Sequence, residues 1–174
     1  MGAEVAEAAV TPRPATREVP LTKRYSLNDD GRSAVAALRI LLVEDNAVNQ
    51  RLVTLLLEKR RHQVVVAENG REALAAMENS AFDVVLMDVQ MPEMDGLEAT
   101  AAIRAGERHS GKHQMVIALT SHAMKGDQER CVAAGMDGYL SKPIRPQELD
   151  IVLENIAKRR SAVENVDSAG IRSN

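Results

Sequence analysis

The sequence predicts an α/β fold in which helices cover a parallel sheet. Short apolar runs recur along the chain, separated by amphipathic stretches; they lie at 40–43, 64–67, 84–87 and 116–119, with a shorter one at 139–140. Regular alternation of short strands with helical stretches is typical of βα units, and such units form parallel sheets. Five strands and five helices are therefore expected.

The first and last predicted helices have the clearest apolar pattern. Residues at helical spacing follow Asn46, a candidate N-cap, and Pro146; they are Val48, Leu52, Leu55 and Leu56 in the first helix and Leu149, Val152, Leu153 and Ile156 in the last. Each set is expected to form the buried face of its helix. Helical composition near 70–78, 96–104 and 125–134 predicts the three helices between them.

One domain with two tails is expected. Residues 1–38 hold three of the six prolines and little apolar periodicity, which is typical of a flexible tail or linker. The domain itself is predicted over 39–158. The remaining stretch, 159–174, is polar and too short for another domain, so it is expected to be a flexible tail.

Composition excludes several classes of function. The net charge is only -3 and charges of both signs are spread along the chain, so no nucleic-acid or direct membrane contact is expected. No apolar run approaches the roughly 20 residues of a membrane helix, and no signal sequence opens the chain, so a cytoplasmic location is expected. The single cysteine, Cys131, is expected to pack on a helix. The histidines lack metal-ligand spacing and are expected at the surface or in loops; they are His62, His109, His113 and His122.

Acidic residues follow the first and third predicted strands directly. Glu44 and Asp45 come after the run 40–43, and Asp88 comes after 84–87. In the flavodoxin-like strand order 2-1-3-4-5, strands 1 and 3 are neighbours, and ligands bind beyond their carboxyl ends. Carboxylates at the ends of apolar strands cost desolvation energy unless a cation compensates. These three acids therefore predict a metal-dependent phosphate site.

The fourth and fifth predicted strands bring further polar groups to this edge. Thr120 supplies a hydroxyl and Lys142 an ammonium. Mg²⁺ prefers oxygen ligands, and it would relieve the repulsion among the acids while holding a phosphoryl oxygen. Phosphoryl transfer depends mainly on positioning and charge stabilisation, which this set provides. Asp88, alone at its strand end, is the expected nucleophile.

The motifs around these residues resemble those of the receiver domains of two-component response regulators. The resemblance covers about 39–158 and rests on LVEDN at 42–46, MDVQMPEMDG at 87–96, ALT at 118–120 and GYLSKP at 138–143. It implies the flavodoxin-like (βα)5 fold with its doubly wound five-stranded sheet. The segments NAVNQ at 46–50 and GMDGY at 135–139 are most similar to receivers of hybrid sensor histidine kinases.

The resemblance implies a role for each site residue. Asp88 is implied to be the phosphoacceptor. The implied ligands of Mg²⁺ are Glu44, Asp45, Asp88 and the backbone carbonyl of Gln90. Thr120 and Lys142 are implied to hold the phosphoryl group, while Thr120 and Tyr139 carry the conformational switch. A cis bond between Lys142 and Pro143 is also implied.

The implied partner carries a phosphohistidine, and it is either a histidine kinase or a histidine phosphotransfer protein. The switch surface is expected at 125–134 and 139–156, where a weak homodimer could form. Whether the chain is a whole protein or a fragment of a hybrid kinase, tethered to a membrane sensor, stays open. So does its standing as an enzyme, since a receiver catalyses only its own phosphorylation and dephosphorylation.

Two alternatives belong to other classes. A phosphatase of the haloacid dehalogenase type also forms an aspartyl-phosphate, but it needs a second aspartate two residues after the nucleophile, and this chain has Gln90 there. A phosphate-independent interaction module would lack some catalytic positions, and here all are filled.

Some positions depart from the pattern of related receivers, namely Arg61, Met115 and Ser121. Arg61 lies at a predicted helix-to-strand turn where such receivers often have glycine. If the backbone there is left-handed, a residue with a side chain costs roughly 1 kcal/mol. The fold is expected to tolerate this cost.

Overall fold

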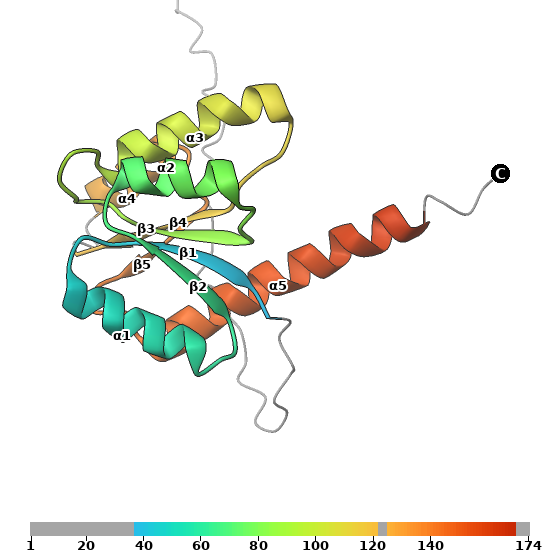
Figure 1. Cartoon of the computed structure of the whole chain (residues 1–174), viewed down its shortest axis with the longest axis horizontal. Coiled ribbons are helices and arrows are strands. Elements are labelled where there is room, and N and C mark those ends of the chain that lie inside the picture. Colours follow the sequence, from blue (N-terminus) through green and yellow to red (C-terminus); the bar gives the residue numbers. More distant parts are fainter. Residues whose placement is uncertain (1–36, 122–124, 170–174) are drawn as a thin grey trace, which may run out of the picture. The chain divides into compact units, whose positions relative to one another are not determined.

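The computed structural model describes residues 37–121 and 125–169, and within them five parallel strands form one sheet (Figure 1). The strand order is β2-β1-β3-β4-β5, which confirms the predicted fold class. The strands are β1 Arg39–Val43, β2 Gln63–Ala67, β3 Val84–Asp88, β4 Val116–Thr120 and β5 Gly138–Ser141. Every residue of β3 and β4 is buried, as expected for parallel strands with helices on both faces.

Helices cover the two faces of the sheet, and two hydrophobic clusters fill the space between (Figure 1). The helices are α1 Ala47–Glu58, α2 Gly70–Asn79, α3 Gly96–Ser110, α4 Lys125–Ala133 and α5 Pro146–Ala169. One cluster joins α1 and α5 to the sheet, and the other joins α2, α3 and α4 to the opposite face. Within the described ranges, no helix combines the length and the apolar character needed to cross a membrane.

The two ends of the described region differ from the predicted domain limits. Leu38, one position before the predicted start, is fully buried. At the other end α5 continues past 158 to Ala169 because this stretch has neither glycine nor proline to stop a helix. Arg160 on this extension forms an ion pair with Asp83 at 3.0 Å, at the approach to β3. The predicted N-terminal tail lies, up to residue 36, outside the described residues.

The apolar pattern of α1 predicted the wrong buried face. Val53 and Leu57 point into the core, with 2% and 0% of their surface exposed. Val48, Leu52 and Leu55 are 76%, 49% and 47% exposed. Both faces of this helix carry apolar residues, so periodicity alone does not tell which face meets the sheet. The pattern of α5 is confirmed, since its residues at 149, 153 and 156 are buried.

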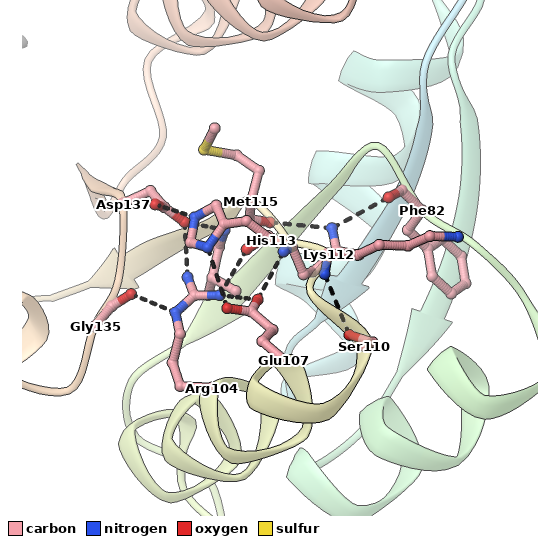
Figure 2. Close-up of polar contacts among 11 residues, drawn as sticks. Phe82, Arg104, Glu107, Ser110, Lys112, His113, Met115, Gly135 and Asp137 are labelled. Atoms are coloured by element: carbon pink, nitrogen blue, oxygen red, sulfur yellow. Dashed lines mark hydrogen bonds and ion pairs between the residues drawn. The ribbon is translucent and has the colours of Figure 1, made fainter. Parts of the chain in front are cut away.

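Arg104 of α3 binds the segments that precede β4 and β5, and Figure 2 shows its contacts with Glu107, Gly135 and Asp137. Its guanidinium donates to the carbonyl oxygens of Gln114 and Gly135, each at 2.8 Å, and to Asp137 Oδ2 at 2.8 Å. It also forms an ion pair with Glu107 of the same helix. The cluster therefore fixes the segments that enter β4 and β5.

Asp137 completes this arrangement through two further groups. The backbone N–H of Val116 donates to its Oδ2 at 2.8 Å, and His113 Nε2 lies 2.7 Å from its Oδ1 (Figure 2). The other ring nitrogen of His113 lies 3.1 Å from Glu107. Each of these carboxylates thus has hydrogen-bond partners for its charge.

The turn between α1 and β2 contains a strained residue. Arg61 has φ 66°, which confirms the left-handed backbone considered for this position. Its N–H donates to the carbonyl of Glu58 at 2.8 Å, so the turn remains closed by a hydrogen bond. That the fold tolerates the cost of this side chain stays a prediction.

His62, the next residue, lies in the turn between α1 and β2, in keeping with the expected surface or loop position, but its side chain is buried. Its Nδ1 accepts the backbone N–H of Leu38 at 3.1 Å. Burial lowers the pKa of His62, and the charge of Arg60 lowers it further, against an opposite influence of Asp150. His109 and His113 are exposed, while His122 lies outside the described residues.

We predict that His62 makes folding stability depend on pH. Both nitrogens of an imidazolium are donors, so protonation removes the acceptor of the Leu38 N–H. Because the folded-state pKa is below the ordinary value of about 6.5, the unfolded state binds more protons between the two values. The contribution of His62 to the free energy of unfolding is therefore fully present above about pH 6.5, and it is lost as the pH falls through the folded-state pKa.

Denaturant midpoints at pH 7.5 and 5.5 test this expectation. His62→Gln, which keeps an acceptor but does not titrate, should reduce the difference between the two midpoints. The exposed His109→Gln is the matched control and should leave the difference unchanged. Equal differences in the native chain and in His62→Gln would remove His62 from this account.

Candidate functional site

The three acids predicted to converge lie together at the carboxyl edge of the sheet. Glu44 and Asp45 follow β1 and Asp88 ends β3, and these two strands pair directly. One carboxylate oxygen from each residue lies within 4.8 Å of the others. Glu44 and Asp88 are 1% and 5% exposed, whereas Asp45 is open to solvent. Two buried charges and one exposed charge therefore share a small volume.

Lys142 enters this cluster from the end of β5. Its Nζ donates to Asp88 Oδ2 at 2.5 Å and lies 2.6 Å from Glu44 Oε2, an ion pair without the alignment of a hydrogen bond. The backbone N–H of Lys142 donates to the carbonyl of Thr120 at 2.8 Å, so the loop after β5 is held to the end of β4. The bond to Pro143 is cis, as the resemblance implied.

The pKa values of Asp88 and Lys142 follow from this arrangement. Burial raises the pKa of Asp88 above its ordinary value, and Lys142 and the Gln90 N–H, 3.2 Å from Oδ1, offset this only in part. Burial alone would lower the pKa of Lys142, but Asp88 and Glu44 outweigh it and raise the pKa. Lys142 is therefore cationic at neutral pH. With one ammonium for three carboxylates, the site keeps a surplus of negative charge.

The donor set fits a hard divalent cation. Its oxygens come from carboxylates, and Glu44 Oε2 is buried without an aligned hydrogen-bond donor. The surplus negative charge would be neutralised by a cation of this kind, and Mg²⁺ binds oxygen ligands of this type. The residues present therefore satisfy the chemistry that a magnesium site requires.

A cleft of about 480 Å³ opens at Asp88. Its wall includes Thr120, the buried last residue of β4, and Ser121 after it. On the other side, Asp127 and Arg130 of α4 line the same cleft. The hydroxyl predicted at this edge is thus in place beside the acids, with room for a ligand between them.

Two residues without a predicted role hold Glu44 in position. Asn49 Nδ2 donates to Glu44 Oε1 at 2.9 Å, and Gln50 Nε2 donates to the Glu44 backbone carbonyl at 2.6 Å. Both lie in the first turn of α1, which Asn46 caps by accepting the N–H groups of Val48 and Asn49. The signal in the sequence is a pair of amides one helical turn after a buried acid.

Gly96 is a third residue without a predicted role, and its importance appears only in three dimensions. A Cβ atom at this position would lie 2.1 Å from the backbone oxygen of Asp88. Its N–H donates to the carbonyl of Val89 at 3.1 Å, so the first turn of α3 is closed against the end of β3. Glycine is required here because no side chain fits.

Tyr139 lies in β5 away from the acids. It is partly buried and packs against the cluster between the sheet and α2, α3 and α4. This places its ring on the face of the sheet that α4 covers. Thr120 and Tyr139 thus come from paired strands, since β4 and β5 are hydrogen-bonded neighbours.

A parallel five-stranded sheet with an acidic cluster at its carboxyl edge defines a phosphoacceptor of the receiver class. Residues 40–154 match the response regulator receiver domain family. The chain belongs to this family, and it therefore contains a phosphoacceptor domain of two-component phosphorelays.

Named relatives include sensor kinases. The chain is 44% identical over 137 residues to the sensor protein GacS of Pseudomonas syringae pv. syringae, covering 76% of this chain and 15% of the relative. It is 42% identical over 142 residues to hybrid signal transduction histidine kinase I of Dictyostelium discoideum, covering 78% of this chain and 8% of the relative. The chain thus spans a small part of the length of these relatives.

Two solved structures are informative neighbours. The receiver domain of sensor histidine kinase PA1611 from Pseudomonas aeruginosa PAO1, with a magnesium ion coordinated in its active-site cleft, is 40% identical with TM-score 0.64, covering 71% of this chain and 99% of that one. The Saccharomyces cerevisiae complex of histidine phosphotransfer protein Ypd1 with the receiver domain of Ssk1 gives 29% identity and TM-score 0.62, covering 66% and 84%.

Proposed function

We propose that this domain takes a phosphoryl group from a phosphohistidine onto Asp88 with Mg²⁺ bound, and then relays it onward or loses it to water. The observation that carries the proposal is the pairing of buried Asp88 with Lys142, 2.5 Å apart, inside a cluster of three carboxylates. Phosphorylation would also change the conformation of the domain, so the domain acts as a switch. By itself the domain does not turn over a substrate.

The proposed transfer has simple chemistry. A carboxylate oxygen of Asp88 forms a bond to phosphorus while the bond from phosphorus to the histidine nitrogen breaks, and the imidazole leaves. Lys142 exchanges part of its contact with Asp88 for a phosphoryl oxygen. The Thr120 hydroxyl donates to another oxygen. Neither residue has to move a proton, because positioning and charge stabilisation supply most of the catalysis.

Mg²⁺ would be held by Glu44, Asp45, Asp88 and the backbone carbonyl of Gln90. When bound, it supplies positive charge to the phosphoryl oxygens. The surplus of carboxylate charge and the unaligned Glu44 Oε2 support this assignment. The magnesium ion in the PA1611 receiver, at 40% identity, supports it as well.

The two alternative functions have less support. A dehalogenase-type phosphatase requires an acid at position 90, where the side chain is an exposed glutamine. A phosphate-independent module would have no need for a partly buried lysine placed against two buried carboxylates, an arrangement that costs desolvation energy. The assembled Asp88, Thr120 and Lys142 favour phosphorylation.

The proposed phosphodonor is a helical histidine phosphotransfer protein or kinase that docks on α1. Val48, Leu52 and Leu55 form an exposed apolar stripe along one face of this helix. The helix begins two positions after Asp45, so the stripe is continuous with the acidic edge. A partner helix packed on the stripe would present its histidine to Asp88. The yeast complex of Ypd1 with a receiver at 29% identity supports a partner of this type.

Thr120 and Tyr139 are the proposed switch. A phosphoryl group on Asp88 adds negative charge and acceptor oxygens that would draw the Thr120 hydroxyl toward it, and the Tyr139 ring would enter the space vacated. The surface that responds is α4, β5 and α5, where Val132 and Ile151 are exposed. A weak homodimer is proposed to form through the same surface.

The central test is Asp88→Asn. This substitution removes the nucleophilic oxygen and keeps the shape of the side chain, so the fold should remain while phosphorylation is lost. Mass spectrometry after treatment with acetyl phosphate and Mg²⁺ should show a gain of about 80 Da for the native chain only. Asp95→Asn is the matched control, since it lines the same cleft and asparagine also caps a helix.

Three outcomes would count against this assignment. Undiminished labelling of the same site in Asp88→Asn would exclude Asp88 as the acceptor. Repeated release of phosphate by the native chain would favour the phosphatase. No mass change in the native chain would favour the interaction module.

Asp45→Ala tests the metal. The change removes one ligand and one of the charges that attract the cation, so Mg²⁺ affinity should fall at least about tenfold, or about 1.4 kcal/mol. Calorimetric titration measures it. Asp127→Ala removes an acid from the α4 side of the same cleft and should have a much smaller effect. Unchanged affinity in Asp45→Ala would refute the ligand assignment.

Leu52→Asp tests the docking surface. Leu52 is about half exposed, so the fold should tolerate the change, whereas a charge on the stripe should slow transfer from a phosphorylated histidine phosphotransfer protein by about tenfold or more. Labelling by acetyl phosphate should be unaffected, because that donor needs no helix contact. The control Val132→Asp alters an exposed apolar residue on α4. Equal transfer rates for Leu52→Asp and the native chain would contradict docking on α1.

Thr120→Ala tests the switch. The phosphoryl group shifts the equilibrium only through contacts that differ between the two states, and the Thr120 hydroxyl is the proposed contact. Amide NMR spectra with beryllofluoride, a phosphoryl mimic, should show shifts over α4, β5 and α5 in the native chain and smaller ones in Thr120→Ala. Thr120→Ser retains the hydroxyl and should respond like the native chain. Native-chain shifts confined to the loop after Asp88 would overturn the switch.

A further inference from the structure

The turn between β2 and α2 touches both halves of the proposed metal site. At one end the carbonyl of Ala67 accepts the N–H of Glu44 at 3.1 Å. At the other end the N–H of Gly70 donates to the carbonyl of Met94 at 3.2 Å. Met94 belongs to the loop 89–95, which follows Asp88 and includes Gln90. The turn therefore connects the segment of Glu44 to the segment of Gln90.

Gly70 leaves no room for a side chain at this contact. A Cβ atom would lie 2.7 Å from Met94 Cγ, 2.9 Å from Ala99 Cβ and 3.0 Å from the Met94 backbone oxygen. Gly70 and Ala99 are buried. Two of these distances are shorter than non-bonded carbon atoms allow, so a methyl group would force the loop or α3 to move. Glycine is present here for space.

The loop 89–95 depends on such contacts for its shape. Glu93 has φ 67°, a left-handed backbone that is costly for a residue with a side chain. Met91 and Met94 are partly buried and pack on the cluster between the sheet and α2, α3 and α4. The surroundings must hold the loop in this conformation, and the Gly70 contact is the place where α2 does so.

We propose that Gly70 is a positioning residue for the metal site: its missing side chain lets α2 hold the loop 89–95, and thereby the Gln90 carbonyl, at the distance that Mg²⁺ requires. The inference rests on the proposed function, since it takes Gln90 as a ligand. Mg²⁺ demands nearly ideal octahedral geometry, so a displacement of the loop by a few tenths of an ångström reduces its affinity.

Gly70→Ala tests the proposal. Calorimetric titration should show Mg²⁺ affinity reduced about tenfold, the size of effect typical of residues that orient metal ligands. Amide NMR should place the largest shift changes at 89–94. Gly106→Ala is the matched control, because a Cβ at Gly106 has no atom within 4 Å, and it should leave Mg²⁺ affinity unchanged. Val53→Ala, which removes buried atoms beneath α1, controls for a general loss of stability and should also bind Mg²⁺ normally.

A second substitution relieves the crowding. Met94→Ala alone removes packing from the loop and should weaken Mg²⁺ binding about threefold. In Gly70→Ala/Met94→Ala the new methyl no longer meets Met94 Cγ, while its contact with Ala99 Cβ remains, so the double variant should bind Mg²⁺ less tightly than Met94→Ala but should lose less affinity than the sum of the two single losses. If Gly70→Ala does not fold, the comparison of the double variant with Met94→Ala decides the matter, because equal affinities would show that a methyl group at position 70 does not disturb the site.

Three results would overturn the inference: native affinity in folded Gly70→Ala, native affinity in Met94→Ala, or additive losses in the double variant. A native chain that binds no Mg²⁺ and takes up no phosphoryl group would instead overturn the proposed function. Normal Mg²⁺ binding by the native chain together with an unaffected Gly70→Ala would leave the proposed function in place.

Discussion

The ion pairs of the partly buried Lys142 ammonium with Glu44 and Asp88 are the interaction on which the rest of the site depends. Removing two carboxylates from water is costly, and a single ammonium compensates only part of that cost. The raised pKa of Asp88 reflects the uncompensated part. Such a cluster persists because the sheet and helices hold it, and its surplus of negative charge suits it for a cation, while the ammonium of Lys142 can face a phosphoryl oxygen. The site therefore lowers the stability of the fold in return for groups that can bind a ligand.

Carboxylates at the two ends of the sheet differ in how completely their oxygens are hydrogen-bonded. At the end away from Asp88, Asp137 accepts hydrogen bonds from Arg104 and Val116 and meets His113 (Figure 2). At the carboxyl edge, Glu44 Oε2 is buried with only an unaligned ion-pair partner. A cluster whose polar atoms are satisfied fastens α3 to the strands, whereas one with an unsatisfied atom is ready for a ligand.

The sheet and the acidic edge could be predicted from the sequence because both follow from local patterns. Apolar runs define strands buried on two faces, and the carboxyl ends of parallel strands meet at one edge. The buried face of α1 could not be predicted, since both of its faces are apolar and only the position of the sheet chooses between Leu57 and Leu52. The burial of His62 and the close approach at Gly70 and Gly96 depend on segments far apart in the chain. The residues next to His62, Gly70 and Gly96 in the sequence give no indication of these contacts.

The two requirements proposed for phosphoryl transfer, docking of a partner and binding of Mg²⁺, involve helices on opposite faces of the sheet. The exposed stripe of α1 lies beyond Glu44 and Asp45, on the helix that packs with α5. The loop that carries Gln90 is instead held from α2 and α3, on the other face of the sheet. In the proposed function, a partner docked on α1 would not touch the elements that hold the loop of Gln90. Under these proposals, partner choice would change through the surface of α1 while the position of the loop 89–95 stays fixed by Gly70 and Gly96, whose contacts tolerate no added atom.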